Sequence, residues 1–280
     1  MIMADTIGLR VTWGGVRGSN PVCTPGFERF GGATTALMVE TSDPLHKLII
    51  DGGSGLDNLT PFPSPAPAGS GLLMIFTHFH RDHLMGLTGF APLFDETLAN
   101  TLAAPEQEHG MTLETAATRL VSPPYWPVTP FASRPFLNWP AYPAEPYTFG
   151  QFAITWMPVA HPNGCSAYRI VDRESGQALI FATDFEWAAM SSSERDAFFA
   201  FCGERPEILI LDGQFADAEA DRYRGWGHST WQEDLAIARR VNAQQLFITH
   251  HAPQSDDALL EARQQTLSDL FPNARFARQS

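Results

Sequence analysis

One short segment constrains the fold and the chemistry of this chain more than any other, namely His78-Phe79-His80-Arg81-Asp82-His83. It places three imidazoles and one carboxylate one residue after the apolar residues 72–76, which we predict to form a buried strand. Side chains two positions apart on an extended backbone point to the same side, so His78 and His80 are expected to face one cavity. The other two ligand-type residues follow where a helix over residues 84–90 is expected to begin, so they approach from a second direction. This geometry favours two metal ions over one.

Composition is typical of a globular enzyme. The chain has 280 residues, of which 44% are hydrophobic and 18% charged. No apolar run approaches the ~20 residues of a membrane span, so no membrane association is expected. The first residues lack the basic region and apolar stretch of a secretory signal, and we therefore expect a cytoplasmic location.

The charge balance bears on the substrate. Thirty-one acidic residues stand against 18 basic ones, a formal net charge of −13. Binding a long nucleic acid depends on Lys and Arg neutralising phosphates, so no long nucleic acid is expected as a partner. Two bound cations would be the largest local charges in a site, and a small anionic substrate is therefore expected. A homodimer is left open.

Most of the remaining chain alternates apolar strand patterns with turn residues. We predict strands over residues 9–13, 36–40, 47–50, 152–159, 166–171, 178–182, 207–211 and 246–249. A helix capped by Ser229 or Thr230 is expected to run to Val241, with Gln232 or Glu233 closing a capping box, and a last helix is expected over about residues 256–270.

Residues 101–150 differ in character, with nine prolines and many aromatic side chains. So many prolines exclude one long helix. We predict an insertion packed over the mouth of the active site, and a simple surface excursion is the alternative.

Four predicted strands are followed closely by a residue that can bind a metal: His78, His161, Asp184 and His250. In a sandwich of two sheets these strand ends can lie along one edge. That arrangement would gather a dinuclear centre from seven side chains, His78, His80, Asp82, His83, His161, Asp184 and His250.

The His-x-His-x-Asp-His motif and the later ligands in this order resemble the metallo-β-lactamase superfamily, and the likeness covers nearly the whole chain. It implies an α/β fold, a single-domain αββα sandwich over residues 1–280 with two mixed β-sheets flanked by helices. It also implies one metal on His78, His80 and His161, a second on Asp82, His83 and His250, and Asp184 as the bridge. Asp51 matches the buried aspartate that supports the histidine loop from behind.

Single positions separate the branches of this superfamily. True β-lactamases usually have cysteine in place of Asp184, and the redox di-iron branch usually has glutamate in place of His80, so both are disfavoured. Asp212-Gly213-Gln214-Phe215 and the later Gly-His-Ser-Thr loop resemble the tRNA 3′-processing endonuclease and related phosphodiesterases, including cyclic-nucleotide enzymes. This resemblance implies catalytic roles for His228, Asp82 and Asp212, with His228 as general acid beside Asp212.

The implied chemistry is hydrolysis. Two divalent cations lower the pKa of bound water enough to form hydroxide near neutral pH. Nitrogen and oxygen ligands without thiolate suit Zn²⁺, which we prefer, or Mn²⁺ or Fe²⁺. We expect a phosphodiesterase acting on a small or cyclic nucleotide-like diester. The alternative is a carbon-centre hydrolase, a thioesterase or lactonase, which would not need His228; a tRNA 3′-processing endonuclease and a non-catalytic metal-binding module are less favoured.

Overall fold

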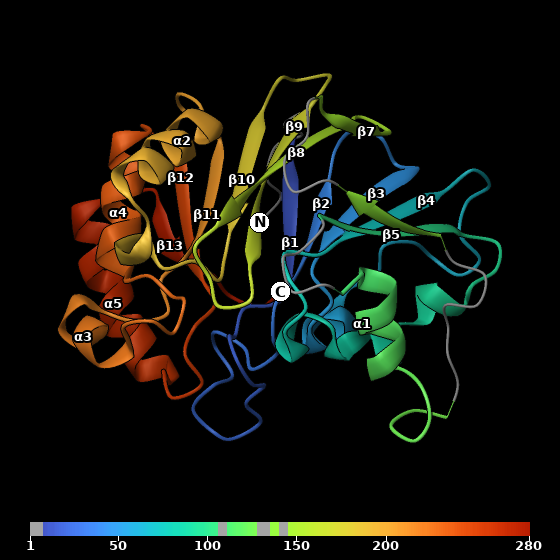
Figure 1. Ribbon diagram of the computed structural model, residues 1–280, viewed down its shortest axis with the longest axis horizontal. Helices are drawn as coiled ribbons and strands as arrows, with labels where there is room; N and C mark the ends of the chain where they lie inside the picture. The colour runs from blue at the N-terminus through green and yellow to red at the C-terminus, as the bar shows by residue number, and fades with distance from the viewer. Residues whose placement is uncertain (1–7, 106–110, 128–134, 140–144) are drawn as a thin grey trace.

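Apolar runs form the centre of the fold in the computed structural model, which describes residues 8–105, 111–127, 135–139 and 145–280 (Figure 1). In strand β4 (Gly71–Ile75), Leu73 and Ile75 face the second sheet, whereas Leu72 and Met74 face an outer layer. A strand that is covered on both faces is apolar along its whole length, because successive side chains point to opposite sides. The unbroken apolar sequence is therefore explained by two packed layers.

The first sheet has its strands in chain order. They are β1 (Arg10–Gly15), β2 (Ala36–Glu40), β3 (His46–Ile50), β4, β5 (Ala99–Pro105) and β6 (Phe136–Trp139). The first three pair antiparallel, and the pairs from β3 to β6 are parallel. The sheet is therefore mixed.

The second sheet is mixed as well. Its order is β13 (Ala274–Phe276), β12 (Gln245–Thr249), β11 (Ile208–Asp212), β10 (Ala178–Ala182), β9 (Cys165–Asp172), β8 (Phe152–Val159) and β7 (Tyr147–Phe149). The strands β7 to β10 pair antiparallel, and β10 to β13 pair parallel.

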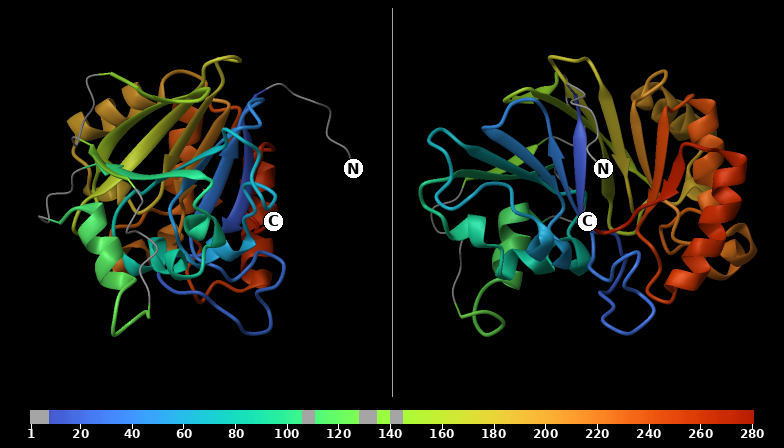
Figure 2. Two further views of the ribbon diagram at one scale, coloured as in Figure 1. Left: turned by 90° about the vertical axis from the view of Figure 1, so that its right-hand side faces the viewer. Right: turned by 180° about the vertical axis from the view of Figure 1, so that it is seen from behind.

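Helices cover the outer face of each sheet, and Figure 2 shows these layers from the side and from behind. On the second sheet lie α2 (Ser192–Cys202), α4 (Trp231–Arg240) and α5 (Asp257–Leu270), with the short α3 (Ala220–Tyr223) nearby. On the first lie α1 (Leu113–Leu120) and several 3₁₀ turns. The predicted αββα sandwich is confirmed. None of the helices in the described ranges has the length and apolar character needed to cross a membrane.

The prediction of a helix over residues 84–90 is wrong. The chain instead forms three short 3₁₀ segments, Arg81–His83, Met85–Thr88 and Ala91–Phe94. Gly86 lies so close to the backbone that an added Cβ would meet the carbonyl oxygen of Gly53 at 2.0 Å. A glycine fixed by this close approach and a following Pro92 both disfavour a regular helix.

Residues 101–150 do not form one separate unit in their described parts. β5 and β6 extend the first sheet, and β7 starts the second. Among the described strands β6 pairs with β5 alone, and this edge position tolerates the flanking prolines. Between them, α1 and the residues after it lie beside the histidine loop. The remaining parts of the predicted insertion are outside the described residues.

The backbone is unusual where strands meet the site. Asp51 follows β3 with φ 62°, Asp184 follows β10 with φ 58°, and His250 follows β12 with φ 60°. Left-handed backbone at non-glycine residues costs about 1–3 kcal/mol and clusters at functional sites. The fold therefore concentrates strain at the edge where its ligand-type residues gather.

Candidate metal centre

All seven predicted metal ligands lie together at one edge of the sandwich. Their ligand atoms fall into close groups, His78 with His80 and His161, Asp82 with His83 and His250, and Asp184 with His78 and His83. The first two groups contain the side chains that the resemblance assigns to two metal sites, and a further group joins Asp184 and His250 to Asp212 and His228.

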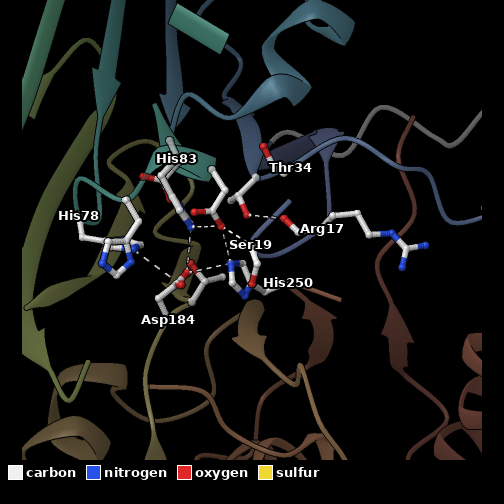
Figure 3. A network of polar contacts seen from close by, with 12 residues as sticks. Arg17, Ser19, Thr34, His78, His83, Asp184 and His250 are labelled. Carbon is white, nitrogen blue, oxygen red and sulfur yellow. Dashed lines mark hydrogen bonds and ion pairs between the residues drawn. The ribbon is translucent and has the colours of Figure 1, made fainter. Parts of the chain in front are cut away.

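Asp184 contacts His78 of the first group and His83 and His250 of the second, as Figure 3 shows. Its Oδ1 is 3.8 Å from the Nε2 atoms of both His78 and His161. Its Oδ2 is 3.2 Å from the Nε2 atoms of both His83 and His250. One carboxylate oxygen thus faces each group, which is the arrangement needed to bridge two cations.

The second group is closed by Asp82. Its Oδ2 lies 3.4 Å from His83 Nε2 and 3.5 Å from His250 Nε2. On the first side, His161 Nε2 lies 3.2 Å from His80 Nδ1. Two ligand atoms that each lie about 2.1 Å from one tetrahedral zinc ion are about 3.4 Å apart, so these spacings fit a shared cation.

Buried polar atoms without partners give an independent test of that fit. The Nε2 atoms of His78, His83 and His250 and the Oδ2 of Asp184 are buried and have no hydrogen-bond partner within the described chain. An unsatisfied buried polar group costs about 1–3 kcal/mol. His78 belongs to the first group and His83 and His250 to the second, so cations bound to each group would give these atoms the partners that they lack.

The electrostatics of the cluster point the same way. Burial lowers the pKa of His78 well below its usual value, and charge on His83 adds to the effect. Burial opposes the charged forms of His83 and His250 as well. The nearby carboxylates, Asp184 above all, outweigh this effect. They raise the pKa of His83 well above its usual value and the pKa of His250 to about 9. Cations binding here would displace protons from these imidazoles.

Asp51 lies behind the histidine loop. Its Oδ2 is 2.8 Å from His83 Nδ1, and its Oδ1 accepts the backbone N–H of Thr77 at 2.8 Å. A carboxylate on the far nitrogen fixes the tautomer and orientation of a ligating imidazole. This contact agrees with the supporting position that the resemblance implies for Asp51.

His228 and Asp212 form a pair at the side of the cluster. His228 Nδ1 lies 2.7 Å from Asp212 Oδ2, and the His228 ring is 5.0 Å from the His250 ring and 5.5 Å from the His161 ring. Asp212 Oδ2 also accepts the backbone N–H of Asp184 at 2.8 Å. Asp212 therefore connects the position of His228 to that of Asp184.

Glu186 is a site residue that the sequence analysis missed. Both of its carboxylate oxygens accept the N–H of Gly225 at 2.9 Å, and one accepts the N–H of Gly227 at 3.1 Å. The carbonyl of Gly227 in turn accepts from His161 Nδ1 at 2.9 Å. The only signal in the sequence was a glutamate close after Asp184, and the partners of this buried side chain lie about 40 residues away.

The glycine-rich loop after β1 also contacts the cluster. The Ser19 N–H donates to Asp82 Oδ2 at 2.7 Å. A Cβ on Gly18 would meet the His250 ring at 2.4 Å, so only glycine fits. Arg17 points away from the cluster in Figure 3, is fully buried, and donates to the carbonyl oxygens of Gly31 and Ser255. It anchors the loop that orients Asp82.

A family model described as a beta-lactamase superfamily domain matches residues 46–251. The probable metallo-hydrolase YhfI of Bacillus subtilis is 26% identical over 255 residues, which cover 86% of this chain and 90% of that protein.

Solved structures share the fold over nearly the full length. The metallo-beta-lactamase fold protein YhfI of Bacillus subtilis superposes with a TM-score of 0.69 at 20% identity, covering 97% of this chain and 98% of that one. The short form of human tRNase Z gives 0.64 at 18% identity, with 96% of each chain covered. A diphosphatase from the PhnP family gives 0.66 at 17% identity, covering 97% of this chain and 96% of that one.

Proposed function

Because this chain belongs to the beta-lactamase superfamily and is a metal-dependent hydrolase, we propose that it cleaves a small or cyclic nucleotide-like phosphodiester. A carbon-centre hydrolase would use the same metal ligands. The observation that carries the choice is the His228–Asp212 pair beside the cluster, because an alkoxide leaving a phosphodiester needs a proton.

We propose that two divalent cations, preferably Zn²⁺, occupy the centre. His78, His80 and His161 would hold one, Asp82, His83 and His250 the other, and Asp184 would contact both. When bound, such cations supply a water of lowered pKa and polarise a phosphoryl oxygen. The absence of thiolate from the ligand groups is consistent with Zn²⁺, Mn²⁺ or Fe²⁺.

His228 is proposed as the general acid. When both ring nitrogens carry a proton, Nδ1–H donates to Asp212 Oδ2 across the 2.7 Å contact and fixes the ring, and Nε2–H is left to donate to the leaving oxygen. A positioned acid contributes about 10²–10⁴-fold in rate. Asp212 is a positioning residue in this proposal, because it holds both the ring and the backbone N–H of Asp184.

Asp82 is proposed to act at the second cation site. The Ser19 N–H and the two neighbouring imidazoles hold its Oδ2 in place. A carboxylate fixed in this way can position the attacking water as well as a cation.

The test compares two diesters that differ in their need for an acid. His228→Ala should slow a 3′,5′-cyclic nucleotide, whose leaving group is an alkoxide, by about 10²-fold or more in kcat/KM. Methyl p-nitrophenyl phosphate, whose leaving group needs little protonation, should lose less than about tenfold. Elemental analysis should find about two metals per chain in both the parent and His228→Ala.

Asp184→Ala is the matched variant. It removes the proposed bridge, so metal content should fall and both substrates should slow together. Equal losses on both substrates in His228→Ala would make His228 a loop-ordering residue. Thioesters and lactones would then be as well supported as substrates as phosphodiesters are. A full metal complement in Asp184→Ala would contradict the dinuclear assignment.

A further inference from the structure

A cavity of about 500 Å³ opens directly beside the metal centre, where His78 and His80 form part of its wall. Small-molecule sites are typically concave spaces of about 300–1,000 Å³ with mainly apolar walls and a few polar groups. The cavity has the right size for a low-molecular-weight compound, and the centre forms one of its walls.

Most of the remaining wall is apolar. It is formed by side chains of the histidine loop, of α1 and of the residues on either side of α1, namely Phe79, Leu84, Met111, Ala116, Leu120 and Tyr125. Tyr125 is 79% exposed, and Phe79 and Leu120 are only partly buried. Apolar side chains that stay exposed or partly exposed beside a reactive centre indicate a ligand-binding surface.

The charged residues of the wall are all basic. Arg81 and Arg119 line the cavity, and no carboxylate does so among the residues that the structure describes. This is unexpected in a chain with a net charge of −13. Arg81 Nη2 donates to Asn20 Oδ1 at 2.6 Å, which limits the movement of this guanidinium. The cavity thus combines apolar surface with positive charge.

We propose that this cavity binds a planar apolar group of the substrate while the reacting phosphate lies at the metal centre. The inference rests on the proposed phosphodiesterase function and narrows it. The substrate class is a low-molecular-weight diester that carries an aromatic or base-like substituent, with a further anionic group held by Arg119 at the rim. Because His78 and His80 form part of the cavity wall, the group in the cavity and the reacting phosphate would belong to one molecule.

The experiment measures binding rather than turnover. Methylphosphonate and naphthylmethylphosphonate cannot be hydrolysed and differ only in the aromatic group. Calorimetry on the metal-loaded protein should give at least about tenfold tighter binding of the naphthyl probe, because a single methylene in an apolar pocket is already worth about 10–200-fold. Equal affinities in the parent protein would overturn the inference.

Substitutions on α1 locate the binding. Leu120→Trp fills the cavity and should reduce the preference for the naphthyl probe to near one. Thr118→Trp, on an exposed position of the same helix that does not line the cavity, should retain it. Ala116→Met is a smaller filling substitution that serves if Leu120→Trp does not fold. Retention of the full preference in the folded cavity variants would contradict the assignment.

The rim charge has its own comparison. Arg119→Gln should weaken binding of a carboxylated naphthylmethylphosphonate by about threefold to fivefold, the scale of an exposed ion pair, and leave the uncharged aromatic probe unaffected. Equal effects on both probes would remove Arg119 from the proposal.

Failure of the two proposals can be told apart. A protein that hydrolyses phosphodiesters but shows no aromatic preference would retain the proposed function and lose this inference. A protein that prefers the naphthyl probe but turns over only thioesters or lactones would lose the phosphodiesterase assignment and keep the cavity as the place of the apolar group.

Discussion

Asp234 is a buried carboxyl group close to the proposed catalytic pair. It lies on α4 against Gly213, and neither of its oxygens has a hydrogen-bond partner among the residues described. Burial raises the pKa of Asp234 well above its usual value, and the negative charges of Asp212 and Glu233 add to this. A raised pKa in the folded state means that folding favours the protonated form. The stabilisation is complete below the unfolded pKa of about 3.9 and is lost as pH rises through the folded pKa.

Asp234→Asn should therefore stabilise the protein at neutral pH. The amide has nearly the same shape and never ionises, so the gain in free energy of unfolding should be near zero at pH 4 and grow with pH. It should reach about 1.4 kcal/mol for each unit by which the folded pKa exceeds the unfolded one. Urea unfolding of variant and parent from pH 4 to 9 measures the difference. Asp196→Asn, at an exposed position of α2, is the control. A loss of stability at pH 8 would show that the carboxylate has a partner in the folded state.

Helix starts show how far the sequence defines single elements. The helix after His228 was predicted from its capping box, and the structure has it, with the side chain of Thr230 accepting from the N–H of Glu233. The same pattern, Ser191 followed by Glu194, caps α2, which the sequence analysis missed. The capping pattern was present in the sequence, but the apolar face of α2 is narrow, since its buried residues are Phe198 and Cys202. The helix is stabilised by packing against the second sheet, which its sequence pattern does not reveal.

Ser191→Ala should lower the free energy of unfolding by about 1 kcal/mol, the usual cost of losing a side-chain cap. The Ser191 side chain accepts from the N–H of Glu194, and the Glu194 carboxylate accepts from the N–H of Ser191 at 2.7 Å. Ser192→Ala removes a similar exposed hydroxyl without touching the cap and should change stability by less than about 0.5 kcal/mol. Chemical denaturation gives both values, and equal effects of the two substitutions would argue against the cap. Metal content should stay unchanged in both.

At the scale of the whole molecule, the gathering of the proposed ligands at one edge was predictable and the cavity was not. His78, Asp184 and His250 each follow a strong apolar strand, so sequence order was enough to gather them at one edge. The cavity depends on α1 and its flanking residues reaching the histidine loop, and a proline-rich sequence does not encode that contact locally. The strands β5 and β6 were not predicted either. Their pairing with neighbouring strands makes them part of the sheet, and their own residues do not alternate in a clear strand pattern.

The overall charge and the cavity together lead to a prediction about substrate size. A net charge of −13 with 18 basic residues leaves little positive surface to grip an RNA body, and the cavity of about 500 Å³ fits only a small group. Short diesters should therefore show a higher kcat/KM than a precursor tRNA, measured with the same metal-loaded protein. Each phosphate that Lys or Arg neutralises on double-stranded nucleic acid changes the slope of log K against log[salt] by about 0.9. A protein that makes few such contacts should therefore show a shallow slope. A bacterial tRNA 3′-processing endonuclease assayed in parallel is the positive control. Efficient cleavage of precursor tRNA with a steep salt dependence would overturn the prediction and favour the endonuclease function, because it would require an extended basic surface that grips the RNA.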